Sequence, residues 1–132
     1  MRKISLVVVM GLLTMSFAFG QNNSTEVLYF KAQLACCKAR ACTALQTDVD
    51  SVLIKYFSKQ EIAFRVVALA DETNKALVEK YNAQSQTVIL VRTKKKKEFA
   101  TDLTPIVQAY KQSNDKAKFE QEMKAKIEES LK

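Results

Sequence analysis

The sequence predicts an α/β domain with a four-stranded mixed sheet flanked by helices. Short runs of strand-forming apolar residues alternate with segments of helical periodicity. The last two strand runs are separated only by a very polar turn, which is typical of a β-hairpin. The expected order is β-α-β-α-β-β-α with an added C-terminal helix. Strands joined through helices pair in parallel by a right-handed crossover, so the sheet mixes parallel and antiparallel strands.

The predicted strands cover residues 27–30, 62–69, 87–91 and 98–100. The first run is apolar throughout, which suits a strand buried on both faces. The polar turn of the hairpin consists of four lysines, residues 94–97. We interpret it as a solvated turn that protects a sheet edge, and contact with an acidic partner or a membrane surface is the alternative.

The first helix is predicted between residues 41 and 58, where apolar residues recur every three or four positions. Asp71 or Thr73 can cap the second helix. Thr104 as the N-cap and Pro105 at the first helical position predict the start of a third.

The added C-terminal helix is predicted from about Lys116. Its apolar residues are spaced by four, at Phe119, Met123, Ile127 and Leu131. A stripe this narrow predicts a surface helix with one seam against the domain.

Residues 1–20 have the pattern of a secretory signal peptide. Two basic residues precede an apolar run at residues 4–13, and Ala18 and Gly20 occupy the −3 and −1 positions of a cleavage site. An uncleaved N-terminal anchor is the alternative. No later stretch approaches the about 20 apolar residues of a spanning helix, so we expect a periplasmic or secreted protein without a stable membrane anchor.

Cleavage leaves 112 of the 132 residues, enough for one domain at residues 27–132 after a disordered N-terminus at residues 21–26. The net charge falls from +7 to +5 with the loss of Arg2 and Lys3. Such mild basicity is weak evidence for nucleic-acid binding, and we expect none. The chain has no histidine, which removes the commonest general base and transition-metal ligand. We expect a monomer.

The candidate site is a cysteine cluster. Cys36, Cys37 and Cys42 lie within seven residues, at the carboxyl end of the first predicted strand and before the first helix. A helix N-terminus and the nearby Lys38 and Arg40 favour thiolate over thiol, so we expect at least one cysteine with a lowered pKa.

The spacing of the cysteines limits which of them can form a disulfide. A disulfide needs Cα atoms within about 7 Å. Because Cys37 and Cys42 are five residues apart, a bridge between them requires residues 37–40 to loop back before the helix begins. A bridge from Cys36 to Cys42 has the same requirement.

The predicted topology, with cysteines at the first strand–helix junction, resembles the thioredoxin superfamily. Residues 27–30, the cysteine-bearing loop and residues 74–81 look closest to an exported group of thioredoxin-like proteins, the nitrophenyl-compound nitroreductase subunit family of Bacteroidetes-type bacteria. The resemblance covers most of residues 26–131. The chain has no flavin- or nicotinamide-binding signature, so the resemblance implies at most an accessory to a nitroreductase, with no cofactor.

The chain departs from the superfamily pattern at three positions. Ala39 stands where the second cysteine of Cys-x-x-Cys would fall, so Cys42 matches it only if the loop is three residues longer. Thr87 stands where thioredoxins have a cis-proline that faces the disulfide. Residues 27–30 contain no buried acidic proton acceptor.

Three functions remain open from the sequence. The first is thiol–disulfide exchange with protein thiols or disulfides, as an oxidoreductase in which Cys36 or Cys37 attacks and Cys42 resolves the mixed disulfide. The second is binding of a soft metal or metalloid ion, such as Cu(I) or trivalent arsenic, by three thiolates. The third is a non-catalytic interaction domain that reuses the fold.

Overall fold

The structure is a computed structural model that describes residues 23–33 and 36–132. Its strands are β1 (Ser24–Lys31), β2 (Ile62–Ala68), β3 (Val88–Lys94) and β4 (Lys97–Asp102). Its helices are α1 (Cys36–Phe57), α2 (Lys75–Lys80) after a 3-10 turn at Glu72–Asn74, α3 (Thr104–Ser113) and α4 (Lys116–Ser130). This arrangement confirms the predicted α/β class and the added C-terminal helix.

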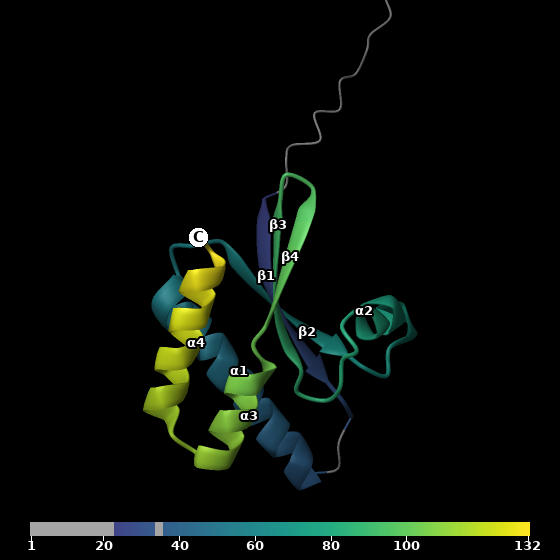
Figure 1. Cartoon of the computed structure of the whole chain (residues 1–132). Helices are drawn as coiled ribbons and strands as arrows, with labels where there is room; N and C mark the ends of the chain where they lie inside the picture. The colour runs from purple at the N-terminus through teal and green to yellow at the C-terminus, as the bar shows by residue number, and fades with distance from the viewer. Residues whose placement is uncertain (1–22, 34–35) are drawn as a thin grey trace, which may run out of the picture.

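The four strands form one mixed sheet in the order β2-β1-β3-β4 (Figure 1). β1 runs parallel to β2 and antiparallel to β3, and β3 and β4 form the predicted hairpin. Val27 of β1 pairs with Phe64 on one side and Leu90 on the other. β1 is therefore an inner strand. Its carboxyl end lies between β2 and β3, and the chain passes from there to the start of α1.

The two faces of the sheet carry separate apolar cores. α1, α3 and α4 cover one face, and the short α2 covers the other (Figure 1). The alternating side chains of β1 supply both cores, with Val27 and Tyr29 on the three-helix face and Leu28 and Phe30 on the α2 face. All four side chains are buried, as expected for a strand covered on both faces.

β1 begins earlier than the sequence predicts. Ser24, Thr25 and Glu26, part of the segment expected to be disordered, pair with the last residues of β3. β3 is long enough to give these polar residues backbone hydrogen-bond partners. This pairing outweighs their polarity, and they join the sheet. The predicted signal peptide lies outside the described residues. Among the described helices, none is both long and apolar enough to cross a bilayer.

α3 and α4 largely follow their sequence signals. Thr104 is not the N-cap of α3, which is Leu103. The Thr104 hydroxyl instead accepts a hydrogen bond of 3.0 Å from the Val88 amide of β3. Asp115 caps α4 by accepting a hydrogen bond from the Lys118 amide. The predicted seam of α4 is confirmed, since its apolar residues Phe119, Met123 and Ile127 are buried.

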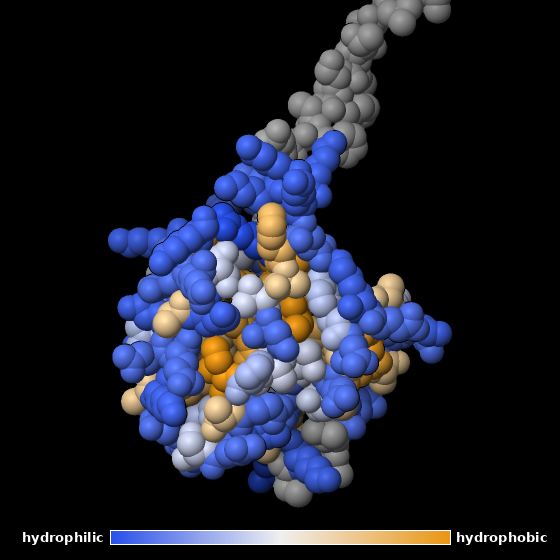
Figure 2. Space-filling model, in the orientation of Figure 1, coloured by the Kyte–Doolittle hydropathy of each residue, from blue (hydrophilic) through white to orange (hydrophobic). Residues whose placement is uncertain are grey.

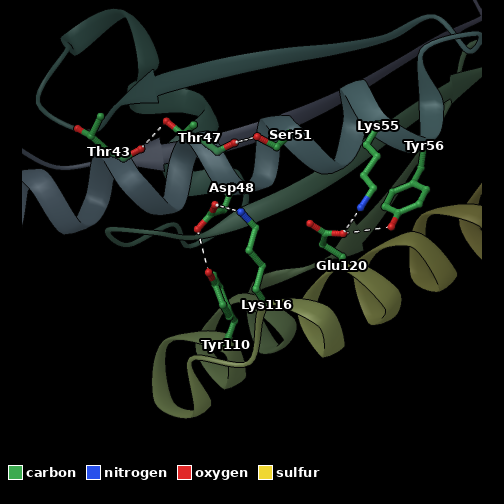
Figure 3. Close-up of polar contacts among 9 residues, drawn as sticks. All are labelled: Thr43, Thr47, Asp48, Ser51, Lys55, Tyr56, Tyr110, Lys116 and Glu120. Atoms are coloured by element: carbon green, nitrogen blue, oxygen red, sulfur yellow. Dashed lines mark hydrogen bonds and ion pairs between the residues drawn. The ribbon is translucent and has the colours of Figure 1, made fainter.

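Two polar clusters hold α1 against α3 and α4 (Figure 3). The Tyr110 hydroxyl donates to Asp48 at 3.0 Å, and Lys116 also pairs with Asp48 at 3.4 Å. Further along α1, Lys55 donates to Glu120 at 2.7 Å, and the Tyr56 hydroxyl donates to the same oxygen at 3.1 Å. The hydrogen bond from Lys55 lowers the pKa of the Glu120 carboxyl, so this cluster stays charged at neutral pH.

The β3–β4 turn is a strained two-residue loop. Lys94 pairs with Lys97, and the central residues Lys95 and Lys96 have positive φ angles of 50° and 64°. Two positive φ angles identify a type I′ turn, which favours Asn-Gly because a side chain with a Cβ costs roughly 1–2 kcal/mol in this conformation.

Replacing the central lysines with the preferred pair, Lys95→Asn with Lys96→Gly, is expected to raise the free energy of unfolding by about 1–2 kcal/mol. Denaturant unfolding measures the change. The control, Lys75→Gln with Lys118→Gln, removes the same charge from exposed helical positions and is expected to change stability by less than about 0.5 kcal/mol. An unchanged or lowered stability of the turn variant would contradict the type I′ geometry.

Candidate thiol site at the start of helix α1

Two of the three candidate cysteines lie in the first turn of α1. α1 begins at Cys36, so Cys36 and Cys37 follow β1 after only the connecting residues 32–35. The first turn contains no acidic residue, and Lys38 and Arg40 beside it are exposed. The free N–H groups and positive dipole end of the helix therefore act on a turn that has no carboxylate of its own. The side chains of Cys36 and Cys37 lie outside the described ones.

Cys42, the third candidate, is a core residue. Its side chain is 0% exposed and belongs to the cluster between the sheet and α1, α3 and α4. The hydroxyl of Tyr29 in β1 donates to the Cys42 carbonyl oxygen at 3.0 Å and lies 3.3 Å from Cys42 Sγ. Burial, reinforced by this contact, raises the pKa of Tyr29, so the phenol stays protonated. The structure therefore places the Cys42 thiol beneath the helix, away from solvent.

The expected start of the first helix at residue 41 is wrong, because residues 36–41 are already helical. This segment contains Ala39, Ala41, Lys38 and Arg40, all good helix formers, and neither glycine nor proline. A helix advances about 1.5 Å and turns about 100° per residue. Cys37 and Cys42 are therefore about 7.5 Å apart along the axis and on different faces, beyond the reach of a disulfide.

The same helix separates the three cysteine positions, because residues 36, 37 and 42 of a continuous helix lie on different faces of its backbone. Among the side chains that the structure describes, no group of three or more histidine, cysteine, aspartate or glutamate residues could hold a metal ion. A three-thiolate site would need the beginning of α1 to unwind.

The loop before β3 pairs with the end of β1 and borders α1 from Ala41 onward. Gln86 N donates to the Phe30 carbonyl at 2.8 Å, and Phe30 N donates to the Thr87 carbonyl at 2.9 Å, so the loop continues the β1–β3 ladder. Gln86 has a positive φ of 68°, and no peptide bond among the described residues is cis. Thr87, at the expected cis-proline position, therefore follows an ordinary trans bond.

Gln86 is a site residue that the sequence pattern does not reveal. It is only 8% exposed, and its side-chain oxygen accepts a hydrogen bond from Lys111 of α3. With Lys111 it borders an open groove of about 290 Å³ whose other wall includes Ala41 and Ala44 of α1. No local signal marks this glutamine as buried, because its burial depends on where α3 packs.

A second open groove, of about 470 Å³, lies along the opposite side of the start of α1. It is lined by Lys31, Ala32, Gln33, Ala39, Thr43, Val66 and Ala68. Lys31 at the end of β1 donates to Thr43 at 3.3 Å and to Gln46 at 3.2 Å, which ties the strand to the helix. Open grooves therefore lie on both sides of α1 between residues 39 and 48.

No protein-family model and no curated protein match the chain. A solved structure described as "Structure of a malarial protein" is 32% identical and covers 61% of this chain and 81% of that chain, with a TM-score of 0.40. A TM-score this low establishes no common fold.

Proposed function

We propose that this chain is an exported, thioredoxin-like protein that exchanges thiols and disulfides, with Cys36 or Cys37 as the attacking thiol. The observation that carries the proposal is the start of α1 at Cys36, four connecting residues after the end of an inner strand. Both cysteines therefore lie in the first turn of α1, where free backbone N–H groups and the positive end of the helix dipole stabilise a thiolate.

In the proposed reaction, the thiolate of Cys36 or Cys37 attacks one sulfur of a substrate disulfide. The sulfur–sulfur bond of the substrate breaks, a mixed disulfide forms, and the released thiolate takes a proton from water. A second thiol then attacks the mixed disulfide and restores the cysteine. The two grooves beside α1 are suitable places for a substrate chain to lie during the first step.

The source of the second thiol depends on α1. Cys42 can resolve the mixed disulfide only if the first turns of α1 unwind and its contact with Tyr29 breaks. The closed helix favours a second substrate thiol instead. We therefore propose that the partner supplies the resolving thiol while α1 remains folded.

Reaction of the reduced protein with glutathione disulfide tests this proposal. The expected product is one glutathione adduct, mapped by mass spectrometry to Cys36 or Cys37, that persists until free glutathione is added. Cys42→Ala is expected to give the same adduct with the same lifetime. An internal disulfide that disappears in Cys42→Ala would instead identify Cys42 as the resolving thiol. Absence of any adduct on Cys36 and Cys37 would refute thiol exchange.

A non-catalytic interaction domain is the second candidate, favoured by the loop before β3. Its trans backbone and the inward-held Gln86 differ from the cis-proline clamp that the family resemblance implies for substrate binding. This function predicts that a partner binds equally well to the wild type and to Cys36→Ser with Cys37→Ser. Loss of binding in the double variant would favour thiol exchange.

A further inference from the structure

We propose that the tip of the β3–β4 hairpin binds the surface of an anionic phospholipid bilayer. The hairpin tip consists of residues 94–97, four consecutive lysines that are all exposed. Lys94 and Lys97 pair directly across the two strands, and Lys95 and Lys96 form the turn between them. This tip is separate from the thiol site, which lies at the start of α1.

This tip lowers the stability of the protein in two ways. Like charges directly opposite each other on paired strands are destabilising, which is the arrangement of Lys94 and Lys97. Lys95 and Lys96 also occupy left-handed backbone positions that favour Asn and Gly. Residues that lower the stability of a protein are expected at sites where they serve another function.

The positive charge of the tip is not compensated by ion pairs within the described part of the chain. None of its four lysines takes part in an ion pair among the described residues. The adjacent Glu98 instead pairs with Lys80 of α2 and accepts a hydrogen bond from the Tyr81 hydroxyl. Glu61 lines the same groove as Lys94 at this end of the molecule, but the two form no ion pair. The excess positive charge is therefore available to an external anion.

The shape and composition of the hairpin favour a membrane surface as the occupant. The hairpin projects from the body of the domain (Figure 1), and this end of the molecule is strongly hydrophilic (Figure 2). Phe99, two residues beyond the tip on the same face as Lys97, is 55% exposed and pairs with Arg92. A projecting basic tip beside an exposed aromatic ring suits lipid phosphates and the headgroup layer together.

Flotation with lipid vesicles tests the proposal. Wild type and variants are all prepared without the predicted signal peptide, residues 1–20, so that they share the same N-terminus. Vesicles contain phosphatidylcholine alone or with about one third phosphatidylglycerol. The wild type is expected to bind only the anionic vesicles and to be released at about 0.5 M salt. Lys95→Asn with Lys96→Gly is expected to bind roughly 30-fold more weakly. Because this variant is expected to be more stable, unfolding would not explain the loss.

The matched control is Lys75→Gln with Lys118→Gln, which removes the same net charge from other elements. It is expected to retain binding within about twofold, because its lysines are not at the tip. An equal loss in both variants would overturn the proposal by attributing binding to net charge. Equal binding to neutral vesicles would overturn it as well. Binding of an acidic peptide or DNA through the tip, without vesicle binding, would assign the tip to another partner.

Discussion

Replacing both Cys36 and Cys37 with serine is expected to slow the reaction with glutathione disulfide by at least about a hundredfold. The only thiol left is that of Cys42, which is buried in the core. It reacts only when the protein opens locally, and an opening free energy of about 3 kcal/mol leaves it accessible less than about one hundredth of the time. Rapid-mixing kinetics with mass detection measures the rate.

The control for this prediction is Cys42→Ala, which leaves the first turn of α1 unchanged. Its initial rate is expected to match the wild type, although loss of the buried sulfur lowers stability by about 1 kcal/mol. A double variant that still reacts at the wild-type rate would show that Cys42 is reached without opening of α1. That result would contradict the assignment of Cys42 as a core residue and of the first turn as the reactive one.

The second large effect is expected from α4. Phe119→Ala is predicted to lower the free energy of unfolding by about 3–5 kcal/mol, because it removes a ring from a closely packed core. Phe119 is 2% exposed, and its ring stacks on Tyr110 of α3 with centroids 4.4 Å apart. Denaturant unfolding followed by circular dichroism measures the loss.

Gln121→Ala is the matched control, since Gln121 lies two residues further along the same helix and is exposed. Its effect is expected to stay within about 0.5 kcal/mol. If Phe119→Ala lowered the free energy of unfolding by less than about 1 kcal/mol, α4 would contribute little to the core. The stability of α1, which α4 holds through Glu120, would then need another explanation.

The fold could be predicted because its elements carry local signals. The apolar run of β1 and the spacing by four along α4 both depend on side chains that are close in sequence, and both are confirmed. α1 starts earlier than predicted because the helix propensity of residues 36–41 outweighs the tendency of a cysteine-bearing junction to form a loop. Their alanines and basic residues, without glycine or proline, are the signal for this earlier start.

The burial of Cys42 also has a signal in the sequence. Cys42 lies three residues before Leu45, which extends the apolar stripe through Leu45 and Val49 by one step. Its partner Tyr29 could not be predicted, because that contact joins a strand to a helix across 13 residues. The buried Gln86 and the left-handed lysines of the hairpin tip likewise depend on tertiary packing and strand register, which no local pattern encodes.

Alkylation of the native, reduced protein tests the central claim most directly, with mass spectrometry following each cysteine separately. We predict that Cys36 or Cys37 is alkylated at a rate typical of an accessible thiol with a lowered pKa. Cys42 is expected to react at least about a hundredfold more slowly until denaturant is added. Alkylation of Cys42 at a comparable rate, or protection of all three thiols in the folded protein, would contradict this prediction.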